Sequence, residues 1–328
     1  MYKVTEIKDI YSMEQKRELP LAWDTHLYLM HTITFPLLSI RGAPYDFRRA
    51  PYENEQFFDR LKLLVEETYR INNNSRVILV GHSMGCLMSV LFLEKQTVEW
   101  KKQYVKAFVS LAGPYGGATK ALRVAASGDN FQVFFRSPLA FRDLQRSFAS
   151  IYLMVPDPRL WPANETLVVT PKREYTTRDY KEFFEDIGFP IGHQLVELSH
   201  SGVDFFKGPT GVDEVYCLYG TSLPTEHKFI YSHPSLFRRP FPNQFPYVLY
   251  GDGDMSVNLR SLECSLTEGK QISLEIVFLT ERHHRITNTD LRFMLKRSNH
   301  GDYYHWKSIC IYTQREILFG EKIIQCYH

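Results

Sequence analysis

The sequence has no long apolar run. No stretch approaches the ~20 consecutive apolar residues that a membrane-spanning helix needs. The longest candidate, residues 27–40, is interrupted by His31 and Pro36. Residues 1–9 are rich in charge and contain no apolar core of the kind that a secretory signal requires. Taken literally, this N-terminus carries no signal peptide and predicts a cytosolic protein.

Excess charge and internal repeats are also missing. The formal net charge is only +2, which gives no electrostatic reason to expect a nucleic-acid partner. The absence of any repeat or low-complexity segment excludes solenoid and repeat architectures. What remains is a chain of 328 residues, 44% of them hydrophobic, which can bury a sizeable core. One large α/β domain, or a core domain with an inserted cap, fits that length.

Cysteines are few, and they do not decide the compartment. The five cysteines allow at most two disulfide bridges and leave one thiol over. Two glycosylation sequons begin at Asn73 and Asn164, although such triplets also occur by chance in cytosolic chains. Neither observation by itself separates a secreted protein from a cytosolic one.

One stretch organises the rest of the chain. An apolar run, residues 77–80, leads into Gly81-His82-Ser83-Met84-Gly85, and a helix-compatible segment follows. Gly-x-Ser-x-Gly between a strand and a helix is typical of a nucleophile elbow, in which both glycines let the two backbones approach. The pattern predicts that Ser83 is a nucleophile at the positive end of the following helix. The backbone N–H of Met84 is then one donor to the oxyanion.

The elements around the elbow predict a parallel sheet. Residues 54–72 carry apolar side chains at helical spacing, and residues 107–112 form a second apolar strand after the elbow helix. Strand, helix and strand in this order are typical of a βαβ unit in an α/β fold. The glycines after residue 112 match neither a phosphate loop nor a dinucleotide motif. Later segments predict strands at 215–220, 247–250 and 272–279 and a short helix at 288–296.

The chain divides into regions of different character. Residues 1–39 show no clean period and form an atypical N-terminal segment, residues 40–298 form the core domain, and residues 299–328 read as an appended tail. Residues 120–215 are predicted to be a cap inserted over the sheet. The cap is rich in aromatic residues, among them Phe131, Phe134, Phe135 and Trp161. These most simply pack the cap's own core, and alternatively some line a groove for an acyl chain.

A serine nucleophile needs a base and a third group that orients the base. Asp252 and Asp254 come directly after one late predicted strand, and His283 and His284 come directly after the next. This is the order of an α/β-hydrolase, with each group at the carboxyl end of a strand, where open α/β sheets place their sites. Turn chemistry for the acids and a solvated loop for the histidines are the alternatives. No further acidic ligands follow at calcium-loop spacing, so no metal is expected.

Several longer strings in this order resemble the lecithin:cholesterol acyltransferase family. The resemblance runs from about residue 40 to about residue 298 and implies an α/β-hydrolase fold. The strings are Arg41-Gly-Ala-Pro-Tyr-Asp-Phe-Arg, Gly81-His-Ser-Met-Gly-Cys, Ser110-Leu-Ala-Gly-Pro-Tyr-Gly-Gly, Ala125-Ala-Ser-Gly-Asp-Asn, Arg178-Asp-Tyr-Lys-Glu-Phe-Phe-Glu-Asp-Ile-Gly-Phe and Cys217-Leu-Tyr-Gly.

The resemblance assigns roles to individual positions. It implies that Ser83 is the nucleophile and that Asp254 is the acid, because Val257-Asn258 matches the end of the family's acid string. Met255-Ser256 departs from that string. His284 is implied as the base, with His283 as the alternative because the local sequence departs from the family's pattern.

The resemblance also bears on the compartment. It implies a disulfide between Cys217 and Cys264. Together with glycosylation at Asn73 and Asn164, that bridge favours the secretory route and a lysosomal or secreted protein.

The activity implied by the resemblance is acyl transfer on lipids. A serine acyl-enzyme formed from a phospholipid would pass its acyl group to water or to a lipid alcohol at a membrane or lipoprotein surface, without a cofactor. The family's second oxyanion donor comes from an N-terminal strand and loop, and only Gly42 precedes the elbow among glycines. We therefore expect the N-terminal strands to be missing. The alternative is a non-catalytic lipid-binding relative, or an incomplete gene product that lacks half of the oxyanion hole.

Overall fold

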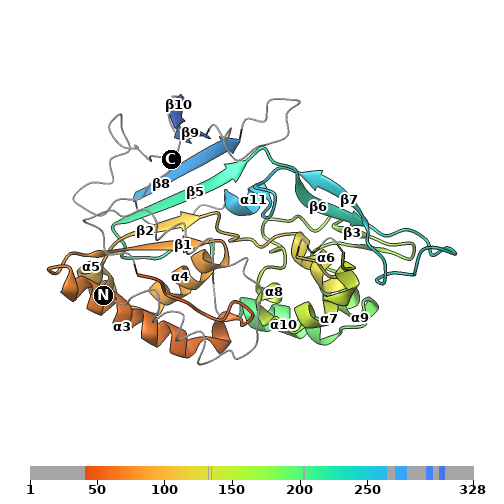
Figure 1. The fold of residues 1–328 in the computed structure, drawn as a ribbon, viewed down its shortest axis with the longest axis horizontal. Helices are drawn as coiled ribbons and strands as arrows, with labels where there is room; N and C mark the ends of the chain where they lie inside the picture. Colours follow the sequence, from red (N-terminus) through yellow and green to blue (C-terminus); the bar gives the residue numbers. More distant parts are fainter. Residues whose placement is uncertain are drawn as a thin grey trace.

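The computed structural model describes residues 41–263 apart from residues 132, 134, 202 and 203, and also the backbone of three later strands. These strands are β8 (Lys270–Phe278), β9 (Phe293–Arg297) and β10 (Tyr303–Trp306). This part of the chain forms two sheets with helices packed beside them (Figure 1). Within it, no helix combines the length and the apolar composition that crossing a bilayer requires.

The larger sheet, sheet A, carries the elbow. Its order is β1-β2-β5-β8-β9-β10 in the described part of the chain, with β1 (Val77–His82), β2 (Val105–Leu111) and β5 (Glu214–Thr221). The first four strands run parallel to one another. Strand β9 pairs antiparallel with β8, and β10 pairs antiparallel with β9. The predicted α/β fold with a mostly parallel sheet is therefore confirmed.

Strand β9 corrects one prediction. The sequence predicts a helix over residues 288–296, yet residues 293–297 form a strand that pairs with β8 from Leu274 to Phe278. Sheet pairing overrides a weak helical period when a neighbouring strand edge is available to satisfy the backbone. Strand β10 comes from the segment predicted to be a tail and pairs with β9.

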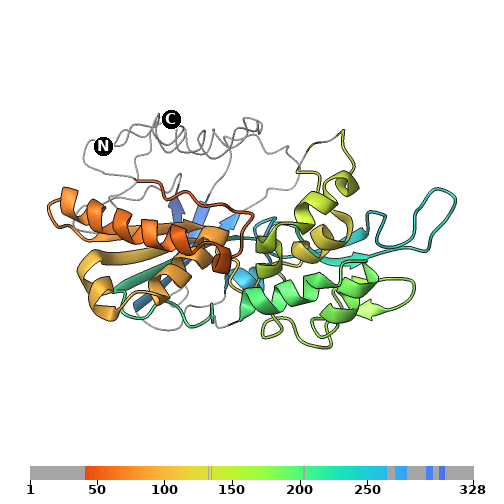
Figure 2. The same cartoon turned by 90° about the horizontal axis from the view of Figure 1, so that it is seen from below.

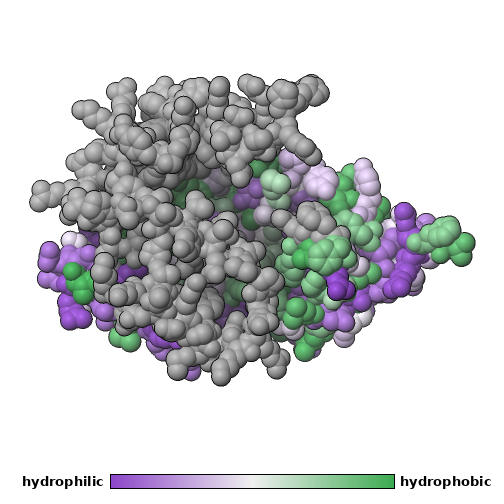
Figure 3. All heavy atoms as spheres, viewed as in Figure 1, coloured by the Kyte–Doolittle hydropathy of each residue, from purple (hydrophilic) through white to green (hydrophobic). Residues whose placement is uncertain are grey.

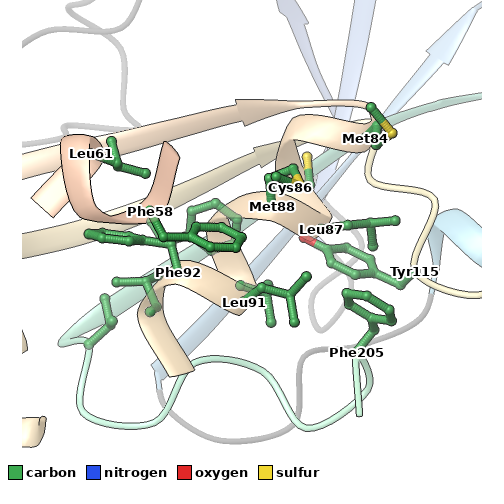
Figure 4. Packing of buried hydrophobic residues seen from close by; sticks show 14 of the residues in the cluster. Phe58, Leu61, Met84, Cys86, Leu87, Met88, Leu91, Phe92, Tyr115 and Phe205 are labelled. Atoms are coloured by element: carbon green, nitrogen blue, oxygen red, sulfur yellow. The ribbon is translucent and has the colours of Figure 1, made fainter. Parts of the chain in front are cut away.

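Helices α3 (Glu55–Ile71) and α4 (Met84–Glu94) pack together beside sheet A (Figure 2). The predicted helix at residues 54–72 is confirmed, with Asn54 and Asn72 as its caps. Helix α4 buries eight of its eleven residues, which is expected of a helix that is apolar on all sides. Phe58 of α3 lies in the same cluster as Phe92 of α4 (Figure 4). The short helix α5 (Val98–Tyr104) follows before β2.

The predicted cap lies between β2 and β5. It contains α6 (Lys120–Ser127), α7 (Arg142–Arg146), α8 (Ala149–Leu153), α9 (Tyr180–Asp186) and α10 (Ile191–His200). Two short cap strands, β3 (Val168–Val169) and β4 (Glu174–Tyr175), join β6 (Thr225–Ile230) and β7 (Tyr247–Gly251) in sheet B, ordered β4-β3-β6-β7. Strand β6 was not predicted, because Thr-Glu-His-Lys precede its two apolar residues. The remaining short helices are η1 (Pro51–Glu53), η2 (Pro138–Ala140) and α11 (Leu259–Leu262).

The cap has a hydrophobic core of its own. Trp161 is fully buried among residues of α6, α8, α9, β3 and β6. This agrees with the interpretation that the cap's aromatic residues pack its own core. Phe131 and Phe135 are instead 55% and 84% exposed, and Phe134 lies outside the described residues.

Arg123 ties α6 to sheet B through a buried ion cluster. Its guanidinium is 3% exposed and donates to both carboxylate oxygens of Glu226, at 2.7 and 2.9 Å. It also donates to Asp129 at 2.7 Å and to the carbonyl of Gly128 at 2.8 Å. Removing the cation leaves two half-buried carboxylates without their main partner, and breaking a buried ion pair in this way is strongly destabilising.

We expect Arg123→Met to lower the free energy of unfolding by about 3–5 kcal/mol, measured by urea denaturation. Lys120→Met is the matched control, because the Lys120 ammonium lies 3.4 Å from the same Asp129 but is 38% exposed. A surface pair of this kind contributes about 1 kcal/mol or less. Equal losses in the two variants would show that the Arg123 cluster does not hold the cap.

Candidate active site

The elbow has the backbone that the sequence predicts. Ser83 connects the end of β1 to the start of α4 with φ 51° and ψ −126°, a region that non-glycine residues rarely occupy. Its N–H donates to the carbonyl of Leu111 in β2 at 2.8 Å, and its carbonyl accepts the N–H of Cys86 at 2.9 Å. Strained backbone held from both sides is common where a side chain must be presented to a substrate.

The two elbow glycines differ in their steric role. A Cβ on Gly81 would lie 2.9 Å from the backbone N and Cα of Cys86, so this strand-to-helix approach requires glycine. A Cβ on Gly85 would meet nothing closer than the Tyr45 hydroxyl, at 3.9 Å. The prediction that both positions require glycine is therefore confirmed at Gly81 and wrong at Gly85, where the backbones do not approach as closely.

Met84 opens α4, and its N–H belongs to the first turn, where N–H groups have no partner inside the helix. The side chain of Met84 is 8% exposed and packs in the hydrophobic cluster under the elbow (Figure 4). The partial positive charge at a helix N-terminus favours negative charge at this point. The position next to Ser83 can therefore stabilise an oxyanion.

Cys86 is the nearest other nucleophile, and its surroundings keep it protonated. The thiol is fully buried and lies 3.4 Å from the carbonyl of Leu111. Burial raises the pKa of Cys86 to about 11, against hydrogen bonds from its neighbourhood that lower it. At neutral or acidic pH the reactive thiolate is absent, so Cys86 is a packing residue.

The loop that carries the two candidate acids, residues 252–258, is called the acid loop here. It reaches sheet A by a route that the sequence does not show. Strand β7, which precedes Asp252 and Asp254, belongs to sheet B and not to the parallel sheet as expected. The chain then returns, and Asp254 forms a parallel bridge with Leu223, two residues beyond the end of β5. Ser83 and Asp254 therefore both lie beyond the carboxyl ends of parallel strands, β1 and β5, with β2 between them.

The two acids make different contacts. Asp252 is exposed and accepts the backbone N–H of Ser222. Oδ1 of Asp254 accepts the N–H groups of Ser256 and Val257 at 2.9 and 2.8 Å. The turn interpretation is thus correct for Oδ1. Within the described part of the chain, Oδ2 of Asp254 has no hydrogen bond, so it can accept one from another group.

Asn258 fixes the acid loop, and the predicted site residues did not include it. It is 2% exposed, its Oδ1 accepts the N–H of Thr119 at 3.0 Å, and its Nδ2 donates to the carbonyl of Glu226 at 2.8 Å. Ser261, also buried, accepts the N–H of Gly116 at 3.0 Å. These bonds tie the acid loop to the loop after β2. The Val257-Asn258 match to the family string was the available signal.

The predicted bases, His283 and His284, lie outside the described residues, as does Cys264. The strand before them, β8, runs parallel to β5 and pairs Val277 with Thr221, so it ends at the same edge of sheet A. Cys217 is buried in β5, and the sequon residues Asn73 and Asn164 are both exposed. Among the described residues, no group of three or more His, Cys, Asp or Glu side chains is placed to hold a metal ion.

Comparison with known proteins points in one direction. The family model described as Lecithin:cholesterol acyltransferase matches residues 23–203, more than half of the chain. The rat lysosomal phospholipase A and acyltransferase is 40% identical over 262 residues, which cover 79% of this chain and 61% of that protein. The human protein of the same name is 42% identical over 233 residues, which cover 71% and 54%.

A second group of relatives carries a different name. Mouse phosphatidylcholine-sterol acyltransferase is 38% identical over 234 residues, which cover 71% of this chain and 52% of that protein. The chain thus spans between about half and three fifths of the length of these relatives, as the shares of 52%, 54% and 61% show.

Proposed function

The chain belongs to the lecithin:cholesterol acyltransferase family, and from this premise we propose that it is a serine-dependent lipid acyltransferase and phospholipase A. The observation that carries the proposal is the backbone of Ser83, which is held at positive φ between a parallel strand and a buried helix. That geometry presents a hydroxyl beside helix N–H groups, which is what acyl transfer through a serine ester requires.

The proposed reaction has two halves. The Ser83 hydroxyl attacks the acyl carbonyl of a phospholipid while His284 accepts its proton and Asp254 orients the imidazole. The N–H of Met84 donates to the oxyanion of the tetrahedral intermediate. The lysophospholipid leaves with the proton from His284, and an acyl-enzyme remains. Water or a lipid alcohol then attacks that ester, with His284 as the base, and His284 returns the proton to the leaving Ser83 oxygen, which gives a fatty acid or an acylated lipid and the free enzyme.

We propose the substrates and the location from the names of the relatives. One set of relatives is named for phospholipase A activity in lysosomes, and the other for transfer between phosphatidylcholine and sterol. We infer a phospholipid donor at a membrane or lipoprotein surface and a lysosomal or secreted protein. A Cys217–Cys264 bridge and glycans at the exposed Asn73 and Asn164 belong to the same proposal.

Labelling with a fluorophosphonate probe tests the proposed function. The probe forms a stable adduct with an activated serine, so we expect the purified protein to be labelled and Ser83→Ala to show no adduct. Ser89→Ala is the control, because Ser89 lies on the same helix and donates to the carbonyl of Gly85 at 2.7 Å. A protein that binds lipid vesicles but takes up no probe would be the non-catalytic relative, and the proposal would then be wrong.

A further inference from the structure

The connection between β6 and β7 ends in an exposed apolar tip, which we define as residues 235–239. Leu236 and Phe237 are 91% and 95% exposed, the highest values among the large hydrophobic residues of the described chain. Figure 1 shows this connection extending away from both sheets, and Figure 3 shows hydrophobic atoms at its end beside hydrophilic ones. Two adjacent large apolar side chains at such a position do not contribute to the core.

The tip is an ordered turn. The N–H of Ser235 donates to the carbonyl of Arg238 at 2.9 Å, and the N–H of Arg238 donates back to Ser235 at 3.1 Å. These reciprocal bonds hold Leu236 and Phe237 at the apex. At the base of the connection, Gln244 is 7% exposed and donates to the carbonyl of Ser232 at 2.8 Å. The turn therefore presents the two side chains from a fixed base.

The charge of the connection is entirely basic. Arg238 and Arg239 follow the apex directly and are exposed, and within the described residues neither forms an ion pair. From residue 231 to residue 251 the sequence contains no Asp or Glu. Arginines directly beside exposed apolar side chains are a composition that binds at the interface of an anionic bilayer.

We propose that the tip docks the protein onto an anionic lipid bilayer, with Leu236 and Phe237 inserted among acyl chains and with Arg238 and Arg239 bound to anionic headgroups. The proposal deepens the proposed function, because it supplies the surface on which a lipid substrate is presented. A protein partner is less suited to this shape, since a specific protein interface buries about 1,200 Å² or more and the apex offers two side chains. A bilayer accepts a small wedge and rewards adjacent cations.

Vesicle flotation measures how much the tip contributes to membrane binding. Every protein in this experiment carries Ser83→Ala, so that the vesicle lipids are not hydrolysed. We expect Leu236→Ser combined with Phe237→Ser to weaken binding to phosphatidylcholine vesicles containing phosphatidylserine by about tenfold or more. Leu63→Ser is the control, because Leu63 is 64% exposed on α3, and it should leave binding unchanged. Arg238→Ala combined with Arg239→Ala should weaken binding to these vesicles by about thirtyfold, and binding to phosphatidylcholine alone should change little.

Separate readouts distinguish the possible failures. Unchanged thermal unfolding should confirm that the tip variants fold, and in the Ser83 background they should hydrolyse soluble p-nitrophenyl butyrate as the parent does. Equal vesicle binding by the parent and the Leu236/Phe237 variant would overturn the docking proposal. Loss of a dimer on size exclusion without loss of vesicle binding would also overturn it, in favour of a second copy of the chain. Absence of ester hydrolysis in every protein would instead refute the proposed function.

Discussion

Ser83→Ala is expected to lower acyl release from phospholipid vesicles by about five to six orders of magnitude, the loss seen when a serine nucleophile that acts with its base is removed. The expectation rests on geometry that is specific to this position. The backbone of Ser83 is at φ 51°, its N–H donates to the carbonyl of Leu111, and eight of the eleven residues in the helix that follows are buried. Alanine fits the same backbone space, so the fold should persist while the nucleophile is lost.

Ser89→Ala provides the matched comparison in the rate measurement. Within the described residues, the Ser89 hydroxyl has one hydrogen bond, which it donates to the carbonyl of Gly85 in α4. We expect its rate to stay within about threefold of the parent, because side-chain bonds of serine to the preceding helical turn contribute little. Substantial release by Ser83→Ala would assign the chemistry to another residue. Cys86 is not a candidate for that role, because its buried thiol has a pKa of about 11.

The elbow could be predicted from sequence because its constraints are local. Gly81 is required by contacts with Cys86, five residues away, and the strand and helix on either side are continuous apolar segments. The same holds for α3, whose apolar stripe and asparagine caps lie within one helix. For such elements the chain order and the residue pattern contain most of the information.

Sheet B and the acid loop could not be predicted in the same way. Strand β6 is largely polar, and it forms between β7, the next strand along the chain, and β3, which lies far away in sequence. The sequence predicts Asp254 at the edge of the parallel sheet because this residue follows β7. Asp254 does lie beyond the end of β5, but β7 belongs to sheet B and does not bring it there. The bridge to Leu223 and the buried Asn258 bring the loop back. Contacts between residues this far apart in the sequence depend on packing, and a local residue pattern does not predict them.

Asp254→Asn is expected to lower acyl release by about 10⁴-fold, because the neutral amide holds the imidazole in the wrong tautomer and does not stabilise the imidazolium. Asn retains an oxygen that can accept the N–H groups of Ser256 and Val257, so the turn should survive. Asp252→Asn is the internal control. Its carboxylate is exposed and accepts the N–H of Ser222, which an amide oxygen also does, and its rate should stay within about threefold.

The two variants decide between the acids, because they make the same chemical change two residues apart in one loop. Asp254 fits the role better, because its Oδ1 is used by the turn while its Oδ2 has no hydrogen bond in the described part of the chain. An orienting acid needs this arrangement, in which one oxygen fixes the carboxylate and the other receives the imidazole N–H. The rate of acyl release is measured for both variants with soluble ester and with vesicles. A large loss of rate in Asp252→Asn with little loss in Asp254→Asn would reverse the assignment. Similar large losses in both variants would show that the loop acts through its fold rather than through one carboxylate.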